Sequence, residues 1–282
     1  MGEQGSAATA PLLESARASM SRPSLSFVIP TRNQARFLRR CIDSCIAQGV
    51  DGAEIIVRDG ASTDGTQQIL ASYGERVRWT SEQDGGQSQA INQGIVEARG
   101  EVIAWINSDD YYADDRVVGR VLARFERDPQ VDVVHGDGMM VDVDERPFRH
   151  YRSRTLDGGR GLLVHPTAIV QPSAFFRRAL FLSVGKLRED LHWAMDFDLW
   201  LRMFPAARKV EYVPEVLSCV RCHTDAKTYH AMLDQIREVT RLKRHYAPRL
   251  RPDLPERVAS VAADLLLYAY WAAVRLGLRR AA

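Results

Sequence analysis

The chain has 282 residues, enough to bury a full hydrophobic core. Its 38 basic and 36 acidic side chains give a net charge of +2, which is not the strongly basic balance typical of a nucleic-acid-binding protein. Only four basic residues are lysines and the first of them is Lys186, so the first 185 residues contain neither a Walker A lysine nor a Schiff-base lysine. The four cysteines form no disulfide framework, and no run of about 18 apolar residues predicts a membrane span, so we expect a cytoplasmic protein.

The first half of the chain alternates strands with helices. Hydrophobic patterning predicts strands at residues 25–29 (which Pro30 should end), 55–57, 77–80, 102–106 and 131–134, with helices at 37–46, 66–73, 90–98 and from about 114 to 125 between them. Such alternation is typical of βαβ units in an α/β fold with a mostly parallel sheet. Residues 1–22 are rich in Ala and Ser and are predicted to be a disordered tail without a signal peptide.

The alternation ends near Gly138. A hairpin is predicted from 139–143 and 148–152, a flexible loop at 158–161, a helix at 196–204, short strands at 210–213 and 216–220, and helices around 232–239 and 265–274. Arg275, Arg279 and Arg280 follow the last helix and could hold it on an anionic membrane surface; a terminal helix packed on the domain is the alternative.

Polar residues follow three of the predicted parallel strands. The apolar strand at 102–106 leads directly into Asn107-Ser108-Asp109-Asp110, and the two other strands lead into residues 30–33 and 58–60. Open α/β sheets bind their ligands at the carboxyl ends of strands, and paired carboxylates suit a divalent cation that in turn binds phosphate. For residues 107–110, a helix cap or Asx-turn is the alternative. No G-x-G-x-x-G follows the first strand, which argues against a dinucleotide site.

Six motifs occur in an order that resembles the family 2 glycosyltransferases, inverting nucleotide-sugar enzymes of the Rossmann-like GT-A fold. They are Phe-Val-Ile-Pro-Thr-Arg-Asn (27–33), Val-Arg-Asp-Gly-Ala-Ser-Thr-Asp-Gly-Thr (57–66), Glu-Gln-Asp-Gly-Gly-Gln-Ser-Gln-Ala-Ile-Asn-Gln-Gly (82–94), Trp-Ile-Asn-Ser-Asp-Asp (105–110), Gln-Pro-Ser-Ala-Phe-Phe-Arg (171–177) and Met-Asp-Phe-Asp-Leu-Trp-Leu-Arg (195–202). The resemblance fades after about Thr228. It implies a nucleotide-sugar-binding half at 23–136, an acceptor-binding and catalytic half at 137–224 and a C-terminal helical extension at 225–282.

The resemblance also assigns roles to residues. Asp59 would bind the nucleobase of a UDP- or dTDP-sugar, and Asp196 would be the catalytic base that deprotonates a hydroxyl of a glycan or lipid-linked acceptor. The remaining donor-site residues would be Pro30, Thr31, Asn33, Asp84, Gln87, Asn107, Ser108 and Asp109. Two positions depart from the family pattern, since Asn107 replaces the first acid of the D-x-D motif and Met195 replaces the usual Glu before the base.

The expected metal site would hold Mn²⁺ or Mg²⁺ on Asp109, with Asp110 and His223 as further ligands. His223 could equally be a solvated loop histidine, and a zinc site of Cys41, Cys45, Cys219 and Cys222 is the weaker metal hypothesis. Trp193 and Trp200 could form an acceptor platform, or belong to the core. Two rival functions remain open: a sugar-phosphate nucleotidyltransferase, although its usual lysine-bearing first loop is missing, and a non-catalytic nucleotide-sugar-binding module.

Overall fold

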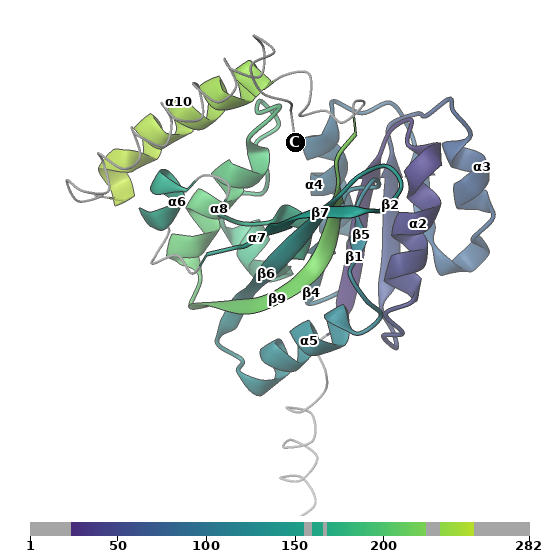
Figure 1. Cartoon of the computed structure of the whole chain (residues 1–282), viewed down its shortest axis with the longest axis horizontal. Helices are drawn as coiled ribbons and strands as arrows, with labels where there is room; N and C mark the ends of the chain where they lie inside the picture. The colour runs from purple at the N-terminus through teal and green to yellow at the C-terminus, as the bar shows by residue number, and fades with distance from the viewer. Residues whose placement is uncertain (1–23, 155–159, 166–167, 224–231, 251–282) are drawn as a thin grey trace, which may run out of the picture.

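The computed structural model describes residues 24–154, 160–165, 168–223 and 232–250. In this part of the chain, nine strands form one sheet in the order β3-β2-β1-β4-β8-β6-β9-β5, with β7 paired to β6 (Figure 1). The predicted tail at 1–22, the helix around 265–274 and its three arginines lie outside the described residues. No helix within the described ranges is long and apolar enough to cross a membrane.

The first four strands of the sheet are parallel. They are β1 (Leu25–Thr31), β2 (Glu54–Asp59), β3 (Arg78–Ser81) and β4 (Val102–Trp105). The prediction that Pro30 ends the first strand is wrong, because β1 continues to Thr31 and Pro30 pairs in register with Arg58. The proline is tolerated because β4 pairs with β1 only as far as Val28, so no neighbouring carbonyl needs the missing N–H.

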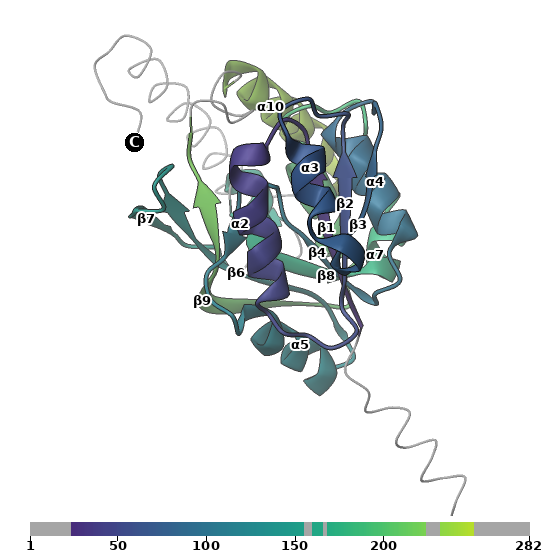
Figure 2. The same cartoon turned by 90° about the vertical axis from the view of Figure 1, so that its right-hand side faces the viewer.

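Helices cover both faces of this parallel region and divide the core into two layers. The helices are α2 (Ala35–Ile46), α3 (Thr66–Ala71), α4 (Gln87–Glu97) and α5 (Val117–Arg127), and α2 lies beside α3 over the sheet in Figure 2. Side chains alternate along β1: Phe27 and Ile29 pack with α2 and α5, whereas Val28 packs with Ile91 and Ile95 of α4. Burial on both faces explains the apolar runs of β1 and β4 and of the middle of β2, whereas β3, at the edge of the sheet, is partly exposed.

The second half of the sheet is mixed rather than parallel. The strands β6 (Val131–Val141) and β9 (Lys209–Arg221) are parallel to each other, while β5 (Tyr111–Tyr112), β7 (Pro147–Tyr151) and β8 (Ala174–Arg177) make antiparallel pairs. The predicted hairpin is present, but its first strand is the end of β6. Likewise, the two short strands predicted at 210–213 and 216–220 form one strand, in which shifts of register interrupt the regular pairing.

The remaining helices pack against the second half of the sheet. They are α6 (Arg160–Val164), α7 (Arg178–Ser183), α8 (Met195–Ala206) and α10 (Met232–Leu250), with short 3₁₀ turns at Gly74–Arg76 and Gln171–Ser173. Arg160 and Gly161, predicted to be loop, begin α6. In Figure 1, α10 lies across α6 and α8 at the edge of the domain.

Candidate active site

The carboxyl ends of β1, β2 and β4 bring three of the predicted polar loops together. Thr31 is the register partner of Asp59, and the N–H of Gly60 donates to the carbonyl of Thr31. On the other side of β1, the N–H of Ile106 donates to the carbonyl of Val28. The three loops therefore start within one or two hydrogen bonds of each other, as the sequence predicted.

Asp59 is buried beneath the loop that follows β2. Its carboxylate accepts hydrogen bonds from the N–H (3.1 Å) and hydroxyl of Ser62 and from the hydroxyl of Ser81 (2.6 Å). The Ser62 hydroxyl also accepts from the N–H of Asn33, and the Asn33 side-chain oxygen accepts from the N–H of Thr63 (2.9 Å). Asn33 adopts φ 53°, a left-handed conformation that asparagine tolerates better than most residues. These contacts join the first two loops into one polar surface.

The hydroxyl of Thr31, the register partner of Asp59, is the next polar group at this edge of the sheet. It is buried and has no hydrogen-bond partner in the structure. A buried hydroxyl without a partner is unfavourable by roughly 1–3 kcal/mol. Thr31 therefore has an unused donor and acceptor at the position where the resemblance expects a nucleotide.

Asp84 and Gln87 border the same region from the start of α4. The Asp84 carboxylate accepts from the N–H of Gly86 (3.0 Å), and a Cβ on Gly60 would lie 3.1 Å from Asp84 Oδ2. Gly60 thus lets the loop after β2 approach Asp84 closely. The side-chain amide of Gln87, the first residue of α4, donates to Asn107 Oδ1 (3.0 Å).

The hydrogen bonds of Asn107 explain why an amide stands where the family has an acid. Its Oδ1 accepts from Gln87 and from the indole N–H of Trp105 (3.2 Å), while its Nδ2 donates to Gln171 Oε1 (3.1 Å). The Gln171 amide donates to the carbonyl of Trp105 (2.7 Å), which leaves its oxygen facing Asn107. An ionised carboxylate could not donate to that oxygen. Ser108, the next residue, is buried.

Asp109 and His223 meet at the ends of β4 and β9. His223 Nε2 lies 3.1 Å from Asp109 Oδ2, and the ring packs against Phe37 at 4.7 Å between centroids, with the two ring planes tilted by 47°. The second ring nitrogen, Nδ1, is buried without a partner. The Asp109 side chain is 20% exposed. The Asp109 carboxylate is a type of ligand that suits Mn²⁺ or Mg²⁺, and Nε2 is the ring nitrogen that faces it, so these are the two atoms that could share a cation.

Asp110, the third predicted metal ligand, lies deeper. Its Oδ1 accepts from the N–H of Arg221 (3.0 Å), and burial, followed by the neighbouring Asp109 carboxylate, raises the pKa of Asp110 well above its usual range. Within the described residues, no group of three or more His, Cys, Asp or Glu side chains is arranged to hold a metal ion. Among the described residues, Asp109 and His223 would therefore be the two ligands, as is common where substrate phosphates complete the coordination of a hard cation.

Arg221 is a residue of this site that the sequence analysis did not identify. It is buried at the end of β9, where its guanidinium donates to the Asp109 carbonyl (3.1 Å), the Val143 carbonyl (3.2 Å) and Glu145 (2.9 Å). It also lies 4.9 Å from the ring centre of Phe37. A single arginine in the sequence carried no signal, because its role depends on β9 pairing with β6 and β5.

Asp196 lies in the first turn of α8. The segment before α8 is fastened to α4, since Asn92 donates to the Leu187 carbonyl (2.9 Å) and accepts from the Leu187 N–H (2.9 Å). Asp196 is partly exposed, and its Oδ1 accepts from the N–H of Phe197 (2.7 Å). Asp198, two residues later, is fully buried and bonded to Arg202 (2.7 Å) and to the Tyr246 hydroxyl (2.9 Å). Of the two acids, only Asp196 has solvent access.

The two tryptophans and the cysteines near the site have different surroundings. Trp200 is 2% exposed, so of its two predicted roles the structure supports core packing and contradicts the acceptor platform, whereas Trp193 is partly exposed. All four cysteines are free, and Cys41 and Cys45 are buried on α2, as expected of small apolar side chains.

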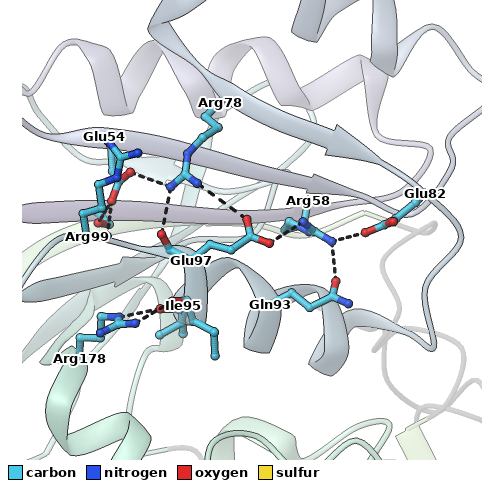
Figure 3. Close-up of polar contacts among 11 residues, drawn as sticks. Glu54, Arg58, Arg78, Glu82, Gln93, Ile95, Glu97, Arg99 and Arg178 are labelled. Carbon is cyan, nitrogen blue, oxygen red and sulfur yellow. Dashed lines mark hydrogen bonds and ion pairs between the residues drawn. The ribbon is translucent and has the colours of Figure 1, made fainter.

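Arg58, immediately before Asp59, is buried and forms ion pairs with two exposed carboxylates in a network that holds α4 on β2. Its guanidinium contacts Glu82, Gln93 (2.6 Å) and Glu97 (3.0 Å), and all four side chains are visible in Figure 3. Arg58 is 6% exposed. The network fixes the helix whose first residue, Gln87, contacts Asn107.

The fold and the polar strand ends define the class of the protein: an α/β domain with the architecture of a nucleotide-sugar enzyme. Residues 26–185 match the family described as "Glycosyl transferase family 2". An uncharacterised glycosyltransferase of Rickettsia typhi is 30% identical over 226 residues, which cover 77% of this chain and 69% of that protein.

Two solved structures are similar in fold. Staphylococcus aureus TarS, in complex with UDP-GlcNAc, has a TM-score of 0.65 and 19% identity, covering 91% of this chain and 76% of that one. The mannosyltransferase PcManGT of Pyrobaculum calidifontis, with GDP-Man and Mn²⁺, has a TM-score of 0.58 and 21% identity, covering 96% and 89%. The chain belongs to glycosyl transferase family 2: it is a glycosyltransferase with the GT-A fold.

Proposed function

We propose that this glycosyltransferase moves a sugar, with inversion at the anomeric carbon, from a UDP- or dTDP-sugar to a hydroxyl of a glycan or lipid-linked acceptor. The observation that supports this most strongly is the convergence of Thr31, Asp59 and Asn107 at the carboxyl ends of three adjacent parallel strands. Brought to this chain as an analogy, the UDP-GlcNAc in the TarS structure and the GDP-Man in the PcManGT structure fit a nucleoside diphosphate at this edge.

In the proposal, the polar surface around Asp59 receives the nucleoside. Pro30, Thr31 and Asn33 line the base and ribose side, and Asp84, Gln87 and Ser108 border the diphosphate and sugar. Asp59 would exchange one of its serine contacts for a donor on the pyrimidine, and the Thr31 hydroxyl would gain the partner that it lacks. The α4 amino terminus adds backbone N–H groups that suit an anionic ligand.

Asp109 and His223 would hold a divalent cation, with Asp110 placed behind them to fix the backbone. When bound, such a cation would stabilise the negative charge that develops on the departing diphosphate. Arg221 would keep the Asp109 loop in place through its contacts with the carbonyls of Asp109 and Val143.

Asp196 would act on the acceptor side. As the acceptor oxygen attacks the anomeric carbon, its proton must leave, and a carboxylate in the first turn of a helix can accept it. A single displacement inverts the anomeric configuration and needs one such base. Asp198 cannot share this role, because it is buried and bonded to Arg202 and Tyr246.

The test is transfer and donor hydrolysis with UDP- and dTDP-sugars in Mn²⁺ or Mg²⁺, for the wild type, Asp196→Asn and Asp198→Asn. We expect Asp196→Asn to lower kcat by about 10²–10⁴-fold while the donor still binds in a thermal-shift assay. Asp198→Asn should instead lower the melting temperature. Wild-type turnover by Asp196→Asn would remove the base from this proposal, and donor binding without any turnover by the wild type would favour a binding module.

A further inference from the structure

The loop immediately before α8 is held by a carboxylate from a distant helix. Glu238 of α10 accepts three hydrogen bonds from successive backbone N–H groups: His192 (3.0 Å), Trp193 (2.8 Å) and Ala194 (2.9 Å). Three neighbouring N–H groups that point at one anion form an anion-binding concavity of the backbone. The loop is thus organised by a residue 44 positions further along the chain.

The local sequence cannot organise this loop by itself. The residue before α8 is Ala194, which has no side chain to cap the helix, and no side-chain cap bond is present. Helices that lack Ser, Thr, Asp or Asn at this position have unsatisfied N–H groups at their start. Glu238 accepts from the Ala194 N–H and from the two N–H groups before it, so it holds the residues that lead into the helix, while Asp196 itself accepts from the Phe197 N–H inside the first turn.

The position of Glu238 is itself fixed by packing. Leu242 and Tyr246 follow it at intervals of four residues, so the three lie on one face of α10. Both are buried in the core layer that includes α8, and the Tyr246 hydroxyl donates to Asp198 (2.9 Å). The helix α10 therefore contacts the α8 region at two points: Glu238 binds the loop before the first turn of α8, and Tyr246 binds Asp198 within α8.

We propose that Glu238 is a positioning residue for catalysis: it fixes the 192–194 loop so that Asp196, two residues later, is held at the acceptor hydroxyl. This inference rests on the proposed role of Asp196 as the base. Misplacing a reacting group by about 1 Å can lower a rate by about 10²-fold. Glu238 would not touch the donor, so its loss should lower kcat and leave the KM for the donor unchanged.

The experiment compares Glu238→Ala and Glu238→Gln with Tyr246→Phe, which removes the other α10–α8 hydrogen bond and serves as the matched control. Hydrogen exchange at the amides of residues 192–194 reports the contact directly, without reference to activity. We expect Glu238→Ala to expose these amides and lower kcat by about 10- to 100-fold at unchanged donor KM. Glu238→Gln keeps one carbonyl acceptor, so its kcat should lie between those of the wild type and Glu238→Ala. Tyr246→Phe should lose stability but keep kcat within about twofold.

Three results would contradict the inference or the proposal beneath it. Wild-type kcat in Glu238→Ala, with Asp196→Asn inactive, would overturn the role of Glu238 alone. An equal loss of kcat in Tyr246→Phe would show that α10 acts only through general stability. Full activity of Asp196→Asn would overturn the assignment of the base, and with it the positioning role.

Discussion

His223 and Asp109, 114 residues apart in the chain, lie within 3.1 Å of each other, and the second nitrogen of the imidazole is buried without a partner. The pairing joins the loop after β4 to the end of β9. It gives the site one carboxylate and one imidazole where the D-x-D motif of the family has two acids.

If this pair holds the cation, His223→Ala should weaken metal activation. We expect the Mn²⁺ concentration for half-maximal turnover to rise by at least about tenfold, because one of the two protein ligands is lost. The measurement is a metal titration of the EDTA-treated enzyme. His150→Ala removes another histidine bonded to an aspartate, Asp137, and should leave the midpoint unchanged. Identical midpoints for the wild type and His223→Ala would exclude His223 as a ligand.

Asp59 should determine donor affinity. Asp59→Ala is expected to raise the KM for the nucleotide sugar by about 10- to 100-fold, the size expected for a hydrogen bond to a charged group. Steady-state kinetics with varied donor measure this directly. Ser81→Ala removes one of the present partners of Asp59 and should change KM much less. An unchanged donor KM in Asp59→Ala would mean that the nucleobase binds elsewhere.

Arg58 should matter for stability. Arg58→Met removes the buried guanidinium that contacts Glu82, Gln93 and Glu97 (Figure 3), and we expect the free energy of unfolding to fall by about 1–3 kcal/mol. Urea titration measures the change. The control is Arg78→Met, whose side chain is 42% exposed and whose ion pairs should contribute less than about 1 kcal/mol. An equal loss of unfolding free energy in both variants would contradict the expectation that the buried Arg58 contributes more than the exposed Arg78.

The stabilising contribution of Glu54 should be lost in acid. Its burial raises the carboxyl pKa, but hydrogen bonds from Ser26, the Arg99 N–H and Arg78 outweigh it and lower the pKa from its ordinary value of 4.5. A carboxylate with a lowered pKa stabilises the folded state above pH 4.5, and this contribution disappears as the pH falls through the folded-state pKa.

Glu54→Gln should therefore be less stable than the wild type at neutral pH, and the difference should shrink below pH 4.5. Urea unfolding at several pH values tests this. Glu75→Gln, a substitution of an exposed residue near β3, removes the same charge and serves as the control for the change in net charge. A difference that stays constant across the acid range would refute the linkage.

Several parts of this fold could be predicted from the sequence because residues close together in the chain determine them. The apolar strands at β1, β2 and β4 and the polar residues that follow them are readable from the chain, since parallel strands buried on both faces exclude polar side chains until they end. The order of the motifs from Pro30 to Asp110 was enough to indicate the family. The acceptor half was harder, because the long strands β6 and β9 contain irregular pairing that looks like separate short strands in sequence.

Only the tertiary structure decided the contacts between segments that are distant in the chain. The amide of Asn107 is explained by the orientation of Gln171, Arg221 acquires its role only when β9 lies beside the Asp109 loop, and Glu238 meets the loop before Asp196 only because Leu242 and Tyr246 pack α10 onto α8. Sequence periodicity reports which face of an element is buried, but not which partner covers it. The sequence by itself therefore determined the strand ends where the donor is expected, and three-dimensional packing decided how the surrounding side chains are held.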